Sequence, residues 1–294
     1  MHWEPAMSTT QTLDLRSRDG HPLAANFFAP AGAPRAAVLI AGAMGVPRRF
    51  YAAFASDLAD HGLAALTLDY RGFGDSAPRH LRGYSASISD WIDHDLPAAL
   101  DALAERAPDA PLLWLGHSVG GQLFGFMDTS RLQGALLVAS QSGHWALWDK
   151  PEWRRRMWTL GHVLLPACAL ALGRFPGRLL GGDDLPAGVA RQWAAWIRDP
   201  EYLGHLARRR DWADFARYQG PLQVVSIADD DYAPPRAGAA LLGYFQQARG
   251  ERVTVTPAEV GAERIGHFDG FRSRHREQLW PQWRNWLLAR AAEA

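Results

Sequence analysis

A serine, a histidine and a group of aspartates stand where they could carry out nucleophilic catalysis. Ser118 lies in the sequence Gly-His-Ser-Val-Gly, directly after the apolar run 111–115. A serine in Gly-x-Ser-x-Gly between a strand and a helix is typical of a nucleophile elbow, a sharp turn that lifts the hydroxyl clear of the sheet. Because a serine hydroxyl is a weak nucleophile at neutral pH, it needs a base within hydrogen-bond reach and a third group that orients this base.

Two later segments supply the base and the orienting acid. His267 lies in a glycine-flanked loop that precedes the C-terminal helical pattern. Asp229, Asp230 and Asp231 follow the strand-like run 222–227, which puts their carboxylates at the carboxyl edge of the predicted sheet. The candidates therefore occur in the order Ser, Asp, His, and each of the three aspartates can be the acid.

The elements that must position these residues alternate between strand-like and helical patterns. Such alternation predicts a parallel sheet covered on both faces. The predicted strands are a hairpin over 12–28 around Asp19-Gly20, followed by 36–40, 63–68, 111–115, 134–139, 222–227 and 252–260. The predicted helices are 51–61, a helix from Ser87 or Ser89 to about 106, 119–127, and a C-terminal helical segment that begins near Pro281.

The alternation stops between about 141 and 218. Seven of the 13 tryptophans of the chain fall in this segment, and no strand-like run does. An insertion after a strand's carboxyl end lies over the crevice where α/β proteins bind ligands, so we expect a helical lid that roofs an apolar pocket. The chain then divides into a disordered tail (1–10), a first core part (11–140), the lid (141–218) and a second core part (219–294).

Three residues are candidates for the lining of this pocket: Met44, His144 and Trp145. His144 follows the end of a strand, and an ordinary surface position is the alternative for it. The lid segment 153–173 combines Trp-Arg-Arg-Arg with an apolar run, and an interfacial membrane helix is a second interpretation of it. Since Pro166 interrupts the run, we favour a lid helix and expect no stable membrane insertion.

Composition excludes several classes of function. Basic and acidic residues are equal at 31 each in 294 residues, so no net charge attracts nucleic acid, and we expect no such partner. The single cysteine, Cys168, excludes an internal disulfide, and the N-terminal residues lack the pattern of a secretory signal. The longest apolar stretch, 163–173, is too short to span a bilayer. We therefore expect a cytoplasmic protein.

Together these strings resemble the α/β-hydrolase superfamily over nearly the whole chain, and most of all a bacterial branch of esterase-like hydrolases with a helical lid. The resemblance rests on four stretches: 116–120, 69–76, the aspartate-rich loop with its following prolines, and 266–268. It implies an α/β-hydrolase fold, with a mostly parallel central sheet flanked by helices and an inserted helical lid.

The resemblance also assigns roles within a catalytic triad. Ser118 corresponds to the nucleophile and His267 to the general base and acid. Asp230 corresponds to the orienting acid, because family loops place a proline four residues after it, as Pro234 stands here. Asp231 has the same spacing to the next proline, and Asp229 lies one residue closer to the strand, so both remain alternatives.

An oxyanion hole is the remaining part of such a site. The backbone N–H of Val119, the residue after the nucleophile, is one expected donor. A second N–H comes from the loop after the strand 36–40, where the sequence Ala-Gly-Ala-Met-Gly (41–45) takes the place of the family's usual His-Gly pair. Ala43 is the expected second donor. Ala41 replaces the histidine, which a backbone donor does not require.

These features predict a serine hydrolase that acts on carboxylic esters through an acyl-enzyme. The aromatic lid predicts an apolar acyl or alcohol group of small to medium size, and the partner is a small-molecule ester. The mechanism implies no cofactor and no metal. Related acyl transferases and thioesterases use the same apparatus, and a catalytically idle binding protein with this fold is the alternative from another class. The sequence does not determine the oligomeric state.

Overall fold

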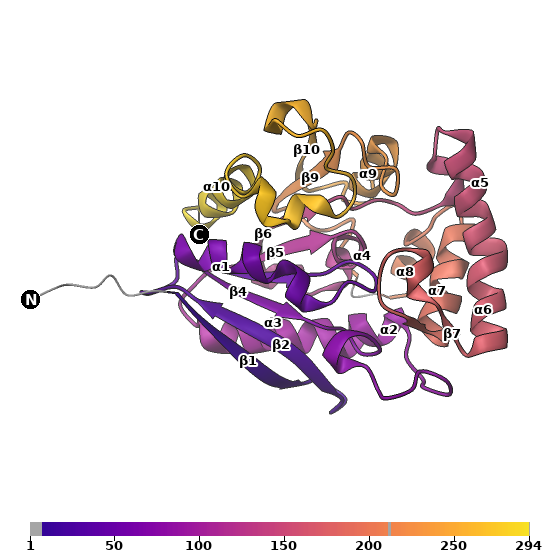
Figure 1. Ribbon diagram of the computed structural model, residues 1–294. Coiled ribbons are helices and arrows are strands. Elements are labelled where there is room, and N and C mark those ends of the chain that lie inside the picture. Colours follow the sequence, from indigo (N-terminus) through magenta and orange to yellow (C-terminus); the bar gives the residue numbers. More distant parts are fainter. Residues whose placement is uncertain (1–7, 211–212, 294) are drawn as a thin grey trace, which may run out of the picture.

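An eight-stranded sheet forms the centre of the computed structural model, which describes residues 8–210 and 213–293 (Figure 1). The strand order is β1-β2-β4-β3-β5-β6-β9-β10. From β4 to β10 all neighbours run parallel, and β2 is antiparallel to both β1 and β4, so the predicted mostly parallel sheet is confirmed. The strands are β1 (Thr9–Arg16), β2 (Pro22–Ala29), β3 (Ala36–Ala41), β4 (Leu63–Leu68), β5 (Leu112–His117), β6 (Leu132–Val138), β9 (Pro221–Ile227) and β10 (Arg249–Val255).

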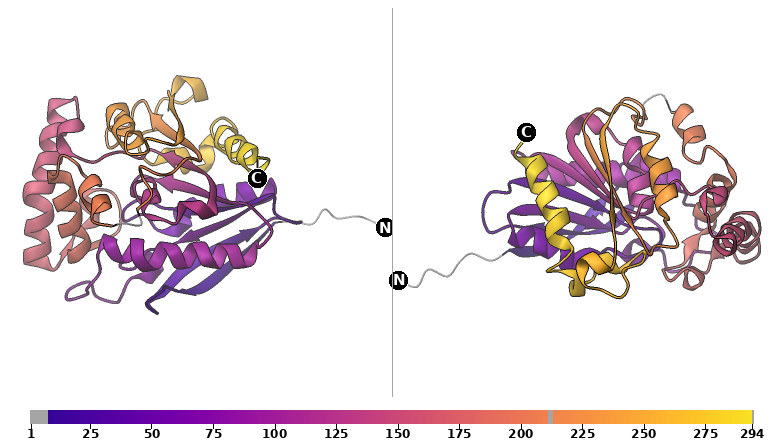
Figure 2. Two further views of the ribbon diagram at one scale, coloured as in Figure 1. Left: turned by 180° about the vertical axis from the view of Figure 1, so that it is seen from behind. Right: turned by 90° about the horizontal axis from the view of Figure 1, so that it is seen from above.

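Helices cover both faces of the sheet, as expected for an α/β-hydrolase fold (Figures 1 and 2). They are α1 (Ala52–Asp60), α2 (Ile88–Asp90), α3 (Leu96–Arg106), α4 (Val119–Gln122), α5 (Pro151–Thr159), α6 (Leu165–Leu172), α7 (Ala187–Arg198), α8 (Gly204–Arg208), α9 (Pro235–Leu242) and α10 (Trp280–Ala291). The π-helical turns Trp91–Asp95 and Leu160–Leu164 join α2 to α3 and α5 to α6. Residues 1–7 of the predicted tail and Trp212 of the predicted lid lie outside the described residues.

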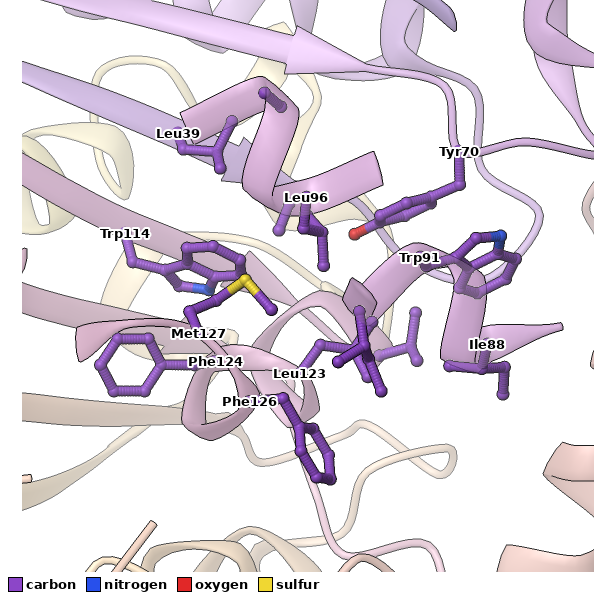
Figure 3. Packing of buried hydrophobic residues seen from close by; sticks show 14 of the residues in the cluster. Leu39, Tyr70, Ile88, Trp91, Leu96, Trp114, Leu123, Phe124, Phe126 and Met127 are labelled. Atoms are coloured by element: carbon purple, nitrogen blue, oxygen red, sulfur yellow. The ribbon is translucent and has the colours of Figure 1, made fainter. Parts of the chain in front are cut away.

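The strands β3 and β5 lie in the middle of the sheet, and all their residues are buried. Successive side chains of a strand point to opposite faces, so Val38 packs in one core with α1 and α10, whereas Leu39 packs in the other with α3 and α4. Figure 3 shows part of the second core, in which the rings of Trp114 and Phe124 lie next to each other, with 5.9 Å between their centroids. Continuous apolar runs in the sequence thus correspond to strands that are covered on both sides.

Two predicted elements end elsewhere than expected, and a third segment contains strands that the sequence did not indicate. The last strand ends at Val255, because Pro257 cannot donate a ladder hydrogen bond and a 3-10 turn follows it. The helix after Ser118 ends at Gln122 and continues only as a 3-10 turn, where the ring of Phe215 packs against Gly125. The segment 141–218 also contains two short strands, β7 (Arg174–Phe175) and β8 (Leu185–Pro186), which pair with each other. At two residues each, they are too short to show an alternating pattern.

The elbow at Ser118 depends on backbone contacts that only glycine permits. Ser118 has a φ of 53°, a left-handed conformation that is costly for a residue with a side chain. A Cβ on Gly116 would overlap the backbone of Gly121, and a Cβ on Gly120 would overlap the carbonyl of Ala41 at the end of β3. These contacts hold the turn between β5 and α4 tightly against the neighbouring strand.

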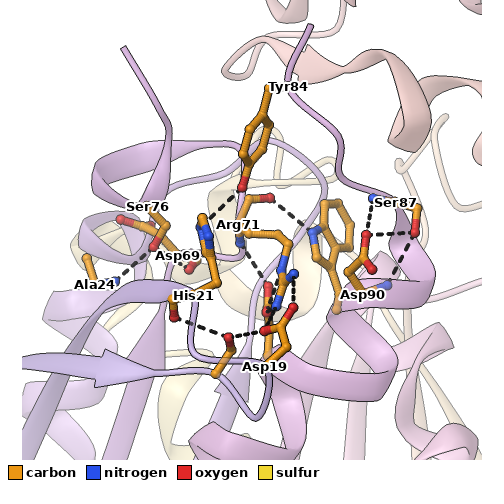
Figure 4. A network of polar contacts seen from close by, with 12 residues as sticks. Asp19, His21, Ala24, Asp69, Arg71, Ser76, Tyr84, Ser87 and Asp90 are labelled. Atoms are coloured by element: carbon orange, nitrogen blue, oxygen red, sulfur yellow. Dashed lines mark hydrogen bonds and ion pairs between the residues drawn. The ribbon is translucent and has the colours of Figure 1, made fainter. Parts of the chain in front are cut away.

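A buried ion-pair network joins the first hairpin to the loop 69–76 (Figure 4). Arg71 donates from Nε to Asp95 at 2.8 Å and from its two terminal nitrogens to Asp19 at 2.7 Å. Burial raises the pKa of the Asp95 carboxyl, whereas the hydrogen bonds from Arg71 hold the pKa of Asp19 below its usual range. The Arg71 side chain therefore holds the loop 69–76 against Asp19 of the first hairpin and against Asp95.

The segment 141–218 lies at the carboxyl end of the sheet, beyond β5 and β6 (Figures 1 and 2). Its helices α5 and α6 both pack against α7, and α7 also contacts α2 of the core. Among the described residues, none of the helices combines the length and the apolar character needed to cross a bilayer. The segment is positioned to cover the region where Ser118 emerges from the sheet.

We predict that Gly120→Ala destabilises the fold by at least about 3 kcal/mol, because the new methyl group must displace the end of β3. Guanidinium unfolding would measure this loss. Gly32→Ala is the matched control, since no atom lies within 4 Å of a Cβ at Gly32, and its stability should change by less than about 0.5 kcal/mol. Equal stabilities of the two variants would show that the elbow does not require this contact.

Candidate active site

The structure brings Ser118, His267 and Asp230 into one hydrogen-bonded line. His267 Nδ1 lies 2.7 Å from Asp230 Oδ2, and His267 Nε2 lies 2.9 Å from Ser118 Oγ. Since a carboxylate can only accept, Nδ1 carries the proton of the neutral imidazole, and Nε2 accepts from the serine hydroxyl. The Asp230 carboxylate is fully buried, and the His267 side chain is only 5% exposed, so water does not compete for these contacts.

Three parallel strands position these side chains. Ser118 follows β5, Asp230 follows β9, and His267 lies in the loop after β10. The strands β5, β6, β9 and β10 run in the same direction, so their carboxyl ends meet at one edge of the sheet. Residues that lie up to 149 positions apart in sequence thus come within hydrogen-bond reach of one another.

The three consecutive aspartates have different surroundings. Asp230 Oδ1 accepts from the N–H groups of Tyr232 and Ala233 at 2.8 and 3.0 Å, which turns its other oxygen toward the histidine. Asp229 accepts from the N–H groups of residues 265 and 266, in the loop that carries the histidine. Asp231 forms an ion pair with Lys150 at 2.6 Å, near the surface. Only Asp230 of the three touches the imidazole.

A second histidine, His117, ties the elbow to this arrangement. Its Nε2 lies 2.8 Å from the backbone carbonyl of His267, so Nε2 carries the proton and donates it. Its Nδ1 must then accept, and it lies 2.8 Å from the hydroxyl of Tyr51. Burial raises the pKa of the Tyr51 hydroxyl far above its usual range, so the hydroxyl stays protonated and donates. Burial, together with the nearby His267, lowers the pKa of His117 well below its usual value.

The Tyr51 hydroxyl also accepts a hydrogen bond from the N–H of Ala43 at 2.7 Å. Ala43 is the residue that the sequence favoured as an oxyanion donor, and the structure shows that its amide is already engaged. The sequence could not indicate this contact, because it depends on how α1 packs against the loop after β3. The amides of Met44 and Val119 have no hydrogen-bond acceptor within the described part of the chain. Val119 thus retains a free N–H beside Ser118.

An apolar cavity of about 60 Å³ opens beside Ser118 and His267. Met44 lines it as expected, whereas His144 and Trp145 are not among its lining residues. His144 lies instead against the backbone of α7, with Nδ1 3.2 Å from the carbonyl of Ile197. The remaining lining residues are Ala43, Gln141, Met157, Leu160, Phe175, Gly177, Leu180, Gly182, Asp183, Leu185, Trp193, Tyr232 and Phe268.

Four polar or aromatic residues near the site were not singled out from the sequence: Tyr51, Gln141, Asp183 and Tyr232. Gln141 donates to the carbonyl of Tyr232 at 3.2 Å, and Tyr232 packs against the His267 ring. Asp183 accepts from the N–H of Gly74 at 3.1 Å. The position of Tyr232 directly after the aspartates was the one available signal. Within 8–210 and 213–293, no group of three or more His, Cys, Asp or Glu side chains could hold a metal ion.

A comparison with models of known protein families identifies the family of the chain. A family model described as Hydrolase_4, serine aminopeptidase, S33, matches residues 32–194, which is more than half of the chain. The chain belongs to this family. It is therefore a serine hydrolase of the α/β-hydrolase superfamily, as the sequence motifs indicated. The matched region includes Ser118 and ends before Asp230 and His267, so the positions of these two residues come from the structure.

Solved structures are similar over almost the full length. Est1E from Butyrivibrio proteoclasticus, with ferulic acid bound, is 17% identical, with a TM-score of 0.62 over 96% of this chain and 99% of that chain. A soluble variant of monoglyceride lipase from Saccharomyces cerevisiae, in complex with a substrate analogue, is 15% identical, with a TM-score of 0.66 over 95% and 96%. At such identities the likeness shows the fold. A search of curated proteins found no match.

We predict that His117 makes the protein less stable in acid. The native pKa of this buried histidine is lowered, so below about pH 6.5 the unfolded chain binds a proton that the native state does not bind. The free energy of unfolding should then fall by up to about 1.4 kcal/mol per pH unit from this one group. Urea unfolding of wild type and His117→Gln between pH 8 and pH 5 would measure the two slopes.

The free energy of unfolding should change with pH more steeply in wild type than in His117→Gln, by up to about 1.4 kcal/mol per pH unit. All other groups titrate alike in both proteins. His80→Gln is the control, because His80 is exposed and its removal should leave the slope unchanged. Parallel curves for wild type and His117→Gln would contradict the prediction.

Proposed function

We propose that the protein is a serine carboxylesterase that hydrolyses esters with an apolar acyl or alcohol group. The observation that carries this proposal is the line from Asp230 through His267 to Ser118, which meets an apolar cavity at the serine hydroxyl. A base already bonded to both the nucleophile and an orienting carboxylate is the arrangement that acyl transfer requires. Family membership supports the hydrolase class.

In this mechanism Ser118 Oγ attacks the ester carbonyl while His267 Nε2 takes its proton. Asp230 stabilises the imidazolium that forms and holds the ring in the required tautomer. His267 then donates the proton to the leaving alcohol, and the acyl group stays on Ser118 as an ester. A water molecule attacks this acyl-enzyme with the same histidine as base, which releases the acid and restores Ser118.

The tetrahedral intermediate carries a negative charge that backbone donors must stabilise. We assign the N–H of Val119 as one donor, because it follows the nucleophile and has no other acceptor in the described part of the chain. The Ala43 amide is engaged by Tyr51, so we assign the second role to the next amide, that of Met44, which lines the cavity. Gly45, with a φ of 67°, allows the turn after Met44.

Ser118→Ala should lower kcat for p-nitrophenyl butyrate by at least about 10⁴-fold, because it removes the hydroxyl that lies 2.9 Å from His267 Nε2. The wild type should also react with a serine-directed fluorophosphonate probe, and the variant should not. If the wild type neither reacted with the probe nor hydrolysed the ester, the result would favour the catalytically idle binding protein. Labelling without turnover of any ester would instead favour an acyl transferase or a thioesterase.

Asp230→Asn should lower kcat by about 10⁴-fold with its fold intact. The asparagine oxygen can still accept from Tyr232 and Ala233, which turns its NH₂ group toward His267 Nδ1. The histidine proton must then move to Nε2, where it blocks acceptance from the serine hydroxyl. Asp231→Asn is the matched control and should retain wild-type kcat, since the Asp231 side chain pairs with Lys150 near the surface, and the backbone carbonyl that accepts from Trp148 is unchanged.

Asp229→Asn should have an intermediate effect, because an asparagine oxygen can replace only one of the two acceptors that hold the loop before His267. If Asp229→Asn or Asp231→Asn lost as much activity as Asp230→Asn, the assignment of the orienting acid would be wrong. Steady-state kinetics and circular dichroism of the three variants would decide.

The apolar side chains of the segment 141–218 that close around the cavity predict a preference for short esters. In wild type, kcat/KM for p-nitrophenyl esters should be highest between acetate and butyrate and at least about tenfold lower for laurate, since Met157, Leu160 and Leu185 limit the room for a long chain beside Ser118. Leu160→Ala removes a lining side chain and should move the optimum toward longer esters. Leu179→Ala is the control, because this exposed leucine does not line the cavity. Equal rates for acetate and laurate in wild type would remove the claim of size selection.

A further inference from the structure

The large apolar side chains that the structure exposes are concentrated in one place. All those that are well exposed in the described part of the chain lie between residues 158 and 179. Leu170 is the most exposed, at 87%. The others are Trp158, Val163, Leu164, Leu172 and Leu179. Soluble proteins rarely expose such a concentration without a binding partner for it.

Most of these residues belong to one continuous helical segment, formed by α5, the π-helical turn and α6 between 151 and 172. Its inner side packs against α7, and Met157 and Leu160 on that side line the cavity beside Ser118. Its outer side carries Trp158, Val163 and Leu170 into solvent. Figures 1 and 2 show this segment at the outer edge of the molecule, and its outer apolar side chains are exposed in the described part of the chain.

Unpaired cations lie at both ends of this apolar side. Arg154 and Arg155 are exposed at its beginning, and the structure gives their side chains no ion pair or hydrogen bond within the described residues. Arg178 is likewise exposed beyond its end, and Arg82 lies beside Gly173. Glu152 is the one acidic residue of α5. The region is therefore locally positive, although the whole chain has a net charge of zero.

We propose that this outer face, made by Arg154, Arg155, Trp158, Val163 and Leu170, adsorbs reversibly to an anionic phospholipid surface. A helix that offers apolar side chains next to arginines binds in the interface of a bilayer without crossing it. Lipid phosphates provide the acidic partners that the arginines lack, and the apolar side chains enter the boundary between headgroups and acyl chains. A second copy of the chain would offer the same excess of positive charge, so the charge favours lipid.

Adsorption would bring the roof of the cavity against a surface that concentrates apolar esters. This role of adsorption in supplying substrate rests on the proposed esterase function, but adsorption itself does not. The arginines and the outer apolar residues make no contact with Ser118 or with the cavity, so binding and catalysis can be measured separately.

Sedimentation with vesicles tests the proposal. Wild type should sediment with phosphatidylglycerol vesicles at low ionic strength and bind pure phosphatidylcholine vesicles much more weakly. Trp158→Ser with Leu170→Ser should lower the partition coefficient by at least about tenfold, because less apolar area is buried. Arg154→Gln with Arg155→Gln should lower it by about fivefold for each charge removed and should weaken its dependence on salt.

The control removes two charges elsewhere. The double variant Arg35→Gln with Arg249→Gln changes the residue before β3 and the first residue of β10. Both lie at the end of the sheet opposite to Ser118, so this variant should bind like wild type. Failure of wild type to bind phosphatidylglycerol, or equal loss in the control, would overturn the proposal. A wild-type dimer in sedimentation equilibrium that Trp158→Ser with Leu170→Ser dissociates would also overturn it, in favour of self-association.

Two further measurements separate this proposal from the esterase function. Ser118→Ala should bind vesicles like wild type, and the surface variants should hydrolyse a soluble short ester at the wild-type rate. If esterase activity were absent and vesicle binding present, only the proposed function would fail. If hydrolysis were normal and binding absent, only the surface proposal would fail.

Discussion

The site depends on a backbone contact between the turn after β5 and the end of β3. Ser118 holds a left-handed conformation that the chain would not adopt by itself, and glycines at 116 and 120 let the surrounding backbone close around it. The indole of Trp114 donates to the carbonyl of Gly120 at 3.1 Å and secures the same turn from the core side. Because β3 ends at this contact, one packing arrangement positions both the serine and the loop that carries Met44.

A buried chain of hydrogen bonds extends this constraint to the histidine. It runs from the Ala43 amide to Tyr51, from Tyr51 to His117, and from His117 to the carbonyl of His267. Each donor finds one acceptor, so no group can turn without leaving a buried polar atom unpaired. The loop after β3, the elbow and the loop after β10 are thereby held in one relative position. The imidazole reaches Ser118 and Asp230 because its own backbone is held.

The helical segment 151–172 connects the cavity to the molecular surface. Its inner side contributes Met157 and Leu160 to the cavity, and its outer side carries exposed apolar residues and arginines. The π-helical turn Leu160–Leu164 lies at the middle of the segment, where the helix is locally wider. The positive and negative charges of the chain are equal in number, but they are unevenly distributed over its surface. Local electrostatics, rather than net charge, decides which surfaces the protein can approach.

The sequence by itself determined the sheet, the elbow and the order of the candidate residues, because apolar periodicity and glycine spacing act over a few neighbouring positions. It could not separate Asp229, Asp230 and Asp231, which share one loop and one composition. Only the tertiary structure turned Asp230 toward His267, and only the packing of α1 engaged the Ala43 amide with Tyr51. It also excluded His144 and Trp145 from the cavity lining. Local conformation follows from adjacent residues, whereas hydrogen bonds between distant segments exist only after the chain has packed.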